Sequence, residues 1–85
     1  MEIEKVILKN LIRDETYTRK VLPFLKDEYF LVEEDKVLYE TINKFILTYN
    51  TQPTMDSLLI EIDSRNGLRD DVVKSIKNTI QSLFG

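Results

Sequence analysis

Hydrophobic residues recur at intervals of three and four along most of the chain, which places them on one face of an α-helix. No strand-like alternation of apolar and polar residues persists for more than a few positions. The chain has only two glycines and two prolines, and such sparse interruption favours helices joined by short connections. The pattern predicts one all-α domain over residues 1–85, a compact bundle of about five to six short helices.

In the first half of the chain, polar residues and a proline mark the helix boundaries. Asp14 follows the first apolar helix and is expected to cap a second one. Pro23 ends that helix or starts a fresh turn, because proline lacks an amide donor and disfavours helical geometry at the residue before it. Asp27 could then cap a single turn, after which a long helix is predicted from Glu34 to about Tyr49.

In the second half, Thr54 is the expected N-cap of the next helix. Gly67 is expected to stop that helix, since glycine suits the left-handed position after a helix end, and Leu68 can fold back onto it. The last helix is predicted to open at Asp70 or Asp71. The loop between Asn66 and Asp70 therefore joins two helices, either as a hairpin within the bundle or as a helix-turn-helix.

The predicted core consists of the apolar positions that share a face within each helix. Ile3 and Val6 belong to the stripe of the first helix, and Phe84 is expected to be buried in the last one. The residues expected to hold the helices together are Ile7, Leu11, Val21, Phe30, Leu38, Ile42, Phe45, Leu58, Ile62, Ile76 and Ile80.

Composition removes most kinds of chemistry from consideration. The chain has no cysteine and no histidine, so it lacks disulfides, thiolate ligands, the commonest general base and the commonest transition-metal ligand. Gly67 is the only internal glycine, which rules out a glycine-rich phosphate loop. We therefore predict no catalytic, cofactor or metal site and a chain that is not itself an enzyme. The longest apolar run is far shorter than the about 20 residues of a membrane span, so we expect a soluble, cytoplasmic protein.

The charged residues disfavour nucleic acid as a direct partner. The net charge is −3, from 12 basic and 15 acidic residues, and the basic ones are spread among carboxylates. A recognition helix carrying Lys74 and Lys77 would begin with two acids that repel the duplex, so the hairpin alternative is favoured. The acidic run at residues 33–35 is interpreted as a solvated helix N-terminus, with a hard-metal site as the weaker alternative.

Three tyrosines are the candidates for a partner surface. Tyrosine combines an apolar ring with a polar edge, which suits an interface that is partly wet. The candidate interface residues are Tyr17, Tyr39 and Tyr49.

The order of short motifs along the chain resembles the N-terminal domain of DnaB-type replicative helicases. The stretch 4–12 is similar to the opening helix of that family, and Thr51–Leu58 to its proline-containing loop and following helix. Between them, Val21–Phe30 resembles a "VxPxxxxEYF" motif of the helicases of T-even-type bacteriophages, and residues 36–49 correspond to the long third helix. The match covers about residues 2–83, and its motifs consist of packing residues whose order and spacing are more specific than each motif alone.

The resemblance implies a non-catalytic collar domain of a hexameric, ATP-driven helicase. Such a collar associates with neighbouring subunits, docks the primase and contributes to contacts with the helicase loader, with no nucleic acid bound by this domain and no membrane. The ATPase domain and the linker hairpin of the family lie outside these 85 residues, so we expect an excised domain in a bacterial host cytoplasm. The alternatives left open are a free-standing helical adaptor of phage or bacterial origin, a small DNA-binding regulator and, least favoured, a stand-alone enzyme.

Overall fold

Helices make up nearly all of the computed structural model, which describes residues 2–85. No strand occurs among these residues, so the predicted all-α bundle is confirmed. The elements are α1 (Glu2–Arg13), α2 (Glu15–Val21), the 3-10 turns η1 (Leu22–Phe24) and η2 (Asp27–Tyr29), α3 (Glu33–Tyr49), α4 (Met55–Ser64) and α5 (Asp70–Phe84).

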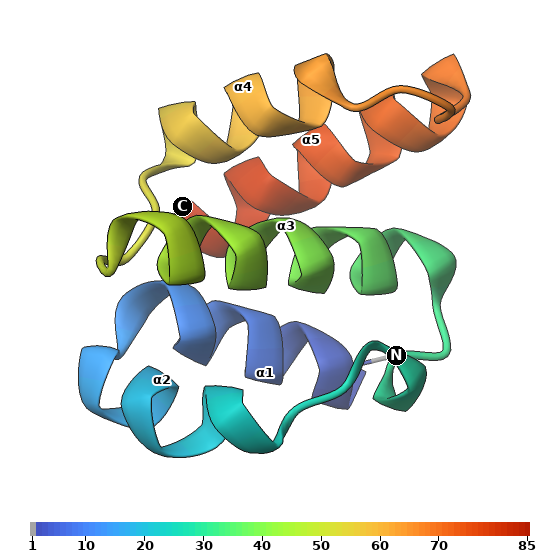
Figure 1. Cartoon of the computed structure of the whole chain (residues 1–85). Helices are drawn as coiled ribbons and strands as arrows, with labels where there is room; N and C mark the ends of the chain where they lie inside the picture. Colours follow the sequence, from blue (N-terminus) through green and yellow to red (C-terminus); the bar gives the residue numbers. More distant parts are fainter. Residues whose placement is uncertain (1) are drawn as a thin grey trace.

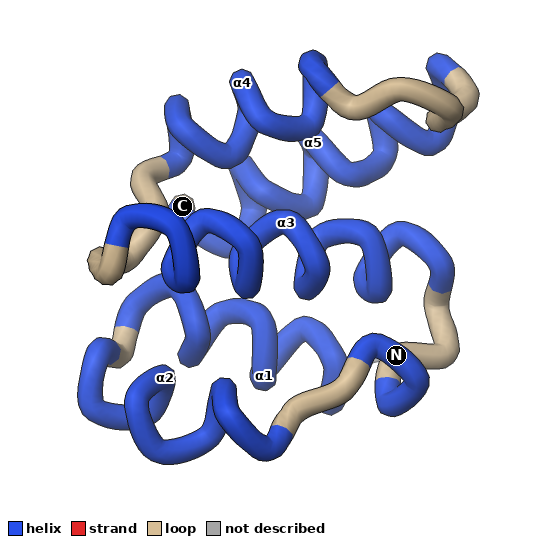
Figure 2. The backbone as a smooth tube through the Cα atoms, in the orientation of Figure 1, coloured by secondary structure: helices blue, strands red, loops and turns tan. Residues whose placement is uncertain are grey.

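The long helix α3 occupies the centre of the bundle (Figure 1). It contacts α1 on one side and α4 and α5 on the other, while α2 packs against α1. Helices α4 and α5 lie side by side as an antiparallel hairpin (Figure 1). The irregular stretch that contains η1 and η2 runs from the end of α2, past the N-terminal end of α1, to the start of α3 (Figure 2). The molecule measures 33 × 25 × 24 Å.

Two predicted helix caps are present. The side chain of Asp14 accepts a hydrogen bond from the backbone amide of Tyr17 at 3.0 Å and so begins α2. Thr54 and Ser57 form a capping box, in which each side chain accepts from the other residue's backbone amide, at 3.1 and 2.9 Å. These local signals lie within a few residues of the boundary that they set, which is why the sequence predicts them.

A proline and two left-handed residues lie at or beyond helix ends. Pro23 starts the fresh 3-10 turn η1 directly after α2. Asn50 closes α3 in the left-handed conformation, at φ 54°. Gly67 is left-handed as predicted, at φ 84°, but it does not stop the helix, because α4 already ends at Ser64 and Arg65 continues in extended conformation.

The core draws at least one large apolar side chain from every α-helix except the short α2. Eight of the expected core residues are buried, and partly buried Leu68 packs against them as predicted. The side chains that are essentially without solvent contact are Leu8, Leu11, Phe30, Leu38, Ile42, Leu58, Ile62, Ile76 and Ile80. Ile7 and Phe84 are partly buried against this core.

Several predicted positions in the core are wrong. Ile3 and Val6 are exposed, because α1 turns the face of Glu4, Leu8 and Leu11 towards the bundle. Phe45 is only half-buried and lies outside the core cluster, where its ring contacts Tyr49 with centroids 4.6 Å apart. Val21 is likewise half-buried and outside that cluster, and the neighbouring Leu22 takes the inward position.

No helix within residues 2–85 combines the length and the apolar character that crossing a membrane requires.

Candidate interaction surface

The three candidate tyrosines occupy different environments. Tyr49 is 58% exposed near the end of α3, and Tyr17 is half-buried against the core. Tyr39 is only 4% exposed, so it belongs to the core and its candidacy as a surface residue is wrong. Among the described residues no aromatic contact joins any two of the three.

Tyr39 is buried because its ring and its hydroxyl both find partners from the irregular stretch. The ring stacks on Phe30 with centroids 4.8 Å apart and an interplanar angle of 18°. The hydroxyl donates a hydrogen bond to the carbonyl oxygen of Leu25 at 3.0 Å. Burial raises the pKa of Tyr39, and the charges of Asp27 and Glu40 raise it further, so the hydroxyl keeps its proton and remains a donor.

Exposed apolar side chains are the feature of this surface that the sequence prediction missed. They concentrate in three places: the outer face of α1, the irregular stretch, and the region from the end of α3 through α4. The large ones are Ile3, Val6, Phe24, Tyr29, Leu31, Leu47, Tyr49, Met55 and Ile60. Phe24 and Leu31 are the most exposed of all, at 77% each, and both belong to the irregular stretch. Scattered single residues of this kind are ordinary, whereas Phe24, Tyr29 and Leu31 all lie in this one short stretch.

Glu4 fastens the end of this stretch to α1. Its carboxylate is buried and accepts hydrogen bonds from the backbone amides of Leu31 and Val32, at 3.1 and 3.3 Å. Burial alone would raise the pKa of Glu4, but the two amide donors and the neighbouring Asp35 side chain together leave that pKa below its ordinary value. The ionised carboxylate of Glu4 therefore fixes the backbone at Leu31 and Val32, while the side chain of Leu31 extends into solvent.

Asp35 forms a second polar contact at the same end of the bundle. Although it was expected to be solvated with its neighbours at the start of α3, it is fully buried, and this expectation is wrong. One carboxylate oxygen pairs with Lys5 Nζ at 2.6 Å, and Oδ2 has no hydrogen-bond partner among the residues described. The pair links α1 to α3, and Lys5 is the cation that compensates the buried charge.

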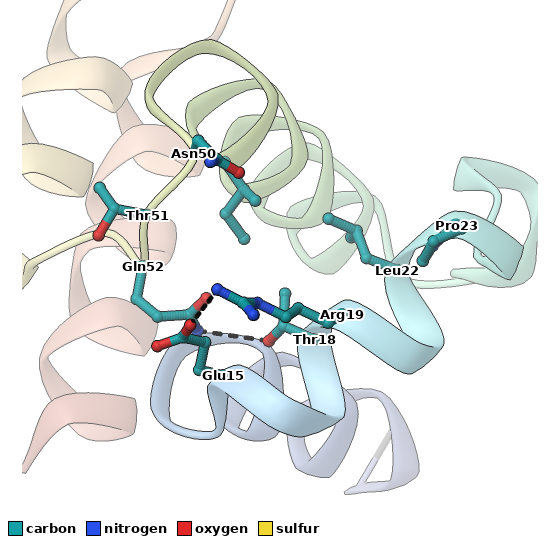
Figure 3. Close-up of a pocket in the computed structure, with 9 residues that line it drawn as sticks. Glu15, Thr18, Arg19, Leu22, Pro23, Asn50, Thr51 and Gln52 are labelled. Atoms are coloured by element: carbon teal, nitrogen blue, oxygen red, sulfur yellow. Dashed lines mark hydrogen bonds and ion pairs between the residues drawn. The ribbon is translucent and has the colours of Figure 1, made fainter.

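One hollow lies between α2 and the loop after α3 (Figure 3). Its volume is about 140 Å³, below the roughly 300–1,000 Å³ of pockets for drug-sized ligands. Gln52 projects from the loop and donates to Thr18 Oγ1 at 3.3 Å (Figure 3). It also donates to the carbonyl of Ile12 at 3.2 Å and to that of Leu11. The carbonyls of Leu11 and Ile12 lie at the end of α1, where they have no backbone partner within the helix. The side chain of Gln52 therefore caps the C-terminal end of α1.

A larger and shallower hollow of about 400 Å³ lies between α3 and the irregular stretch. Asp27 contributes to its lining from η2, and Leu47, itself 74% exposed, contributes from α3. Among the charged residues at its edge, Asp27 and Lys44 form no ion pair with any described residue. No group of three or more acidic side chains within residues 2–85 is placed to hold a metal ion. The lining of this hollow offers apolar surface, from Leu47, and charged groups, from Asp27 and Lys44.

Comparison with protein-family models, with curated proteins and with solved structures gave no match for this chain.

Proposed function

We propose that this chain is the non-catalytic N-terminal interaction domain of a DnaB-type replicative helicase of bacteriophage origin. Its task is to associate with neighbouring helicase subunits and to dock the primase during DNA replication, with the helicase loader as a further partner. The chain itself carries out no chemical step, and ATP hydrolysis belongs to the motor domain of the parent protein. The corresponding location is the cytoplasm of the bacterial host.

The single structural observation that supports an interaction role is the exposure of Phe24 and Leu31 on backbone that is firmly held. Both lie in or next to the Val21–Phe30 stretch that resembles the phage helicases. A complete fold that leaves its most exposed apolar side chains in one short segment favours a partner that covers them. The helix order is compatible with the resemblance: an opening helix, a short helix, an irregular Pro-containing stretch, a long helix, and a proline loop followed by a further helix.

The test is a titration of the protein with the primase encoded by the same genome, followed by isothermal calorimetry. We expect saturable association in which each domain occupies one binding site on the primase. A matched titration with the Phe24→Ser variant should give weaker association. No heat of binding with the wild-type protein, at concentrations where the primase is folded, would argue against the primase-docking role.

The second candidate, a free-standing adaptor, differs in what its gene encodes. The helicase proposal expects the reading frame to continue past Gly85 into a segment with a Gly-Lys-Ser or Gly-Lys-Thr phosphate loop. A stop codon directly after Gly85 would favour the adaptor. Sequencing the downstream DNA separates the two, independently of any binding experiment.

A further inference from the structure

The acidic excess of the chain is confined to one segment. Residues 24–36, which we term the acidic segment, contain two basic residues, Lys26 and Lys36, and five acidic ones: Asp27, Glu28, Glu33, Glu34 and Asp35. The other 72 residues contain ten basic and ten acidic residues. The whole net charge of −3 is therefore located in these 13 residues. Because Asp35 is buried against Lys5, the charge that a partner meets comes from the other four acids.

The acidic segment also carries three of the exposed large apolar side chains. Phe24, Tyr29 and Leu31 are 77%, 56% and 77% exposed. Their exposure follows from the backbone: Phe30 turns inward to stack on Tyr39, and Leu31, the next residue in an extended stretch, faces the opposite way. Exposed apolar groups and exposed carboxylates thus share the same short segment. Of these carboxylates only Glu33 has an ion-pair partner among the described residues, Lys36 Nζ at 4.0 Å.

We propose that the acidic segment is the docking surface for a cationic amphipathic helix of a partner protein. The apolar face of that helix covers Phe24, Tyr29 and Leu31. Lysine and arginine side chains along the margins of the helix lie against Asp27, Glu28 and Glu33. This inference rests on the interaction role proposed above and adds the chemistry of the partner, and it does not depend on the helicase family.

The negative charge of the acidic segment favours a cationic helix over a second copy of the chain, nucleic acid or an anionic membrane. A second copy that used the same segment would bring six exposed carboxylates together, three from each copy, and juxtaposed like charges are unfavourable. Nucleic acid and anionic membranes are repelled for the same reason. A helix with basic margins is attracted, and its apolar face matches the exposed rings and the leucine.

The acidic segment is also prepared for binding, because its backbone is fixed before a partner arrives. The carbonyl of Leu25 accepts from Tyr39, and the amides of Leu31 and Val32 donate to Glu4. A surface that is already ordered loses little conformational entropy on association. Leu31 lies seven positions after Phe24 in the sequence, so the two are at most about 25 Å apart. A helix of about 18 residues, roughly 27 Å long, can reach both.

The probe for the test is an 18-residue helical peptide of leucine and lysine, with leucine on one face. We would titrate it into the 15N-labelled 85-residue protein and follow the amide resonances by NMR. The expected result is a set of shifts concentrated in residues 24–34. A matched peptide with glutamate in place of lysine should produce no saturable shifts, because its charge is repelled.

Paired variants separate a specific surface from general attraction. The double variant with Phe24→Ser and Leu31→Ser should bind the lysine peptide with an affinity about tenfold lower or more, since it removes the central apolar contacts. The control is Ile60→Ser, which removes a similarly exposed side chain from α4 and should leave the affinity unchanged.

A second pair of double variants tests the contribution of charge. Asp27→Asn with Glu28→Gln is the test variant, and Asp56→Asn with Asp70→Asn is the control. Both double variants remove two exposed acids, but only the first should weaken binding and flatten its dependence on salt. Equal effects of the two double variants, shifts centred on α4 or α5, or equal affinity for the glutamate peptide would overturn the proposed surface. Failure of the primase titration with success here would overturn the helicase assignment alone.

Discussion

Replacing Glu4 by glutamine tests how the irregular stretch is held. The buried carboxylate of Glu4 accepts two backbone amide hydrogen bonds, and such bonds to a charged acceptor contribute about 1.5–3 kcal/mol each. Glutamine retains one carbonyl oxygen as acceptor, so Glu4→Gln should lower the free energy of unfolding by about 1–2 kcal/mol at pH 7. With a urea slope of about 1 kcal/mol/M for so small a protein, the unfolding midpoint should fall by about 1 M or more.

The pH dependence of this difference gives a second readout. The pKa of Glu4 is lower in the folded protein than in the unfolded chain, so its contribution is fully present above the unfolded value, about 4.3. That contribution is lost as the pH falls through the lower folded pKa. The stability difference between wild type and Glu4→Gln should therefore be constant from pH 7 to about 5 and should shrink towards zero below pH 4.

Urea unfolding followed by circular dichroism at several pH values measures both effects, with Glu28→Gln as the matched control. Glu28 is exposed and accepts no hydrogen bond from the described residues, so its removal should change stability little. If Glu4→Gln were as stable as wild type at pH 7, or if the difference between the two proteins grew on acidification, the role assigned to the Glu4 carboxylate would be refuted.

Three further predictions concern stability. Ile42→Ala should lower the free energy of unfolding by about 2–5 kcal/mol, because Ile42 is fully buried, whereas half-buried Phe45→Ala should lower it by less than half as much; equal melting temperatures of the two variants would contradict this ranking. Lys5→Met should destabilise by about 1–3 kcal/mol by leaving the Asp35 carboxylate without its cation. A double-mutant cycle with Asp35→Leu should recover part of that loss, and strictly additive effects would show that the pair does not interact. Thr54→Ala should cost about 1 kcal/mol in urea unfolding through the lost capping box, and an unchanged midpoint would exclude that contribution.

Helix boundaries were predictable because the signals that set them are local. Asp14 and Thr54 each cap the helix that begins at the next residue, and Pro23 starts its own turn. Such contacts span three residues or fewer, so the sequence carries them without reference to the fold. Gly67 was less informative, because a left-handed residue within a loop and one at a helix end have the same sequence signature.

The orientation of α1 was not predictable because it depends on contacts distant in sequence. Because a carboxylate normally faces solvent, the sequence predicted that the face of α1 with Glu4 would be exposed and that Ile3 and Val6 would be buried. The structure shows the reverse. The partners of Glu4 are the amides of Leu31 and Val32, about 27 residues away, on a stretch with no regular period. Tyr39 was misplaced for a similar reason, since the ring that covers it, Phe30, comes from that stretch.

The candidate surface escaped prediction for the same physical reason. Leu31 stands next to buried Phe30, and Phe24 next to partly buried Leu25, in a segment without helical periodicity. The hydrophobic pattern therefore could not separate inward from outward positions. The clustering of acidic residues, in contrast, is visible in the sequence alone. Combining it with the observed exposure is what distinguishes this segment from the other apolar positions.

Amide hydrogen exchange of the parent protein, alone and with the primase of the same genome, measures most directly whether this domain is a docking module. The proposed function, together with the docking surface inferred above, predicts slowed exchange within residues 24–36 on addition of primase and unchanged exchange in the exposed part of α4 around Ile60. Exchange that stays the same throughout the 85 residues while the two proteins form a complex would contradict it.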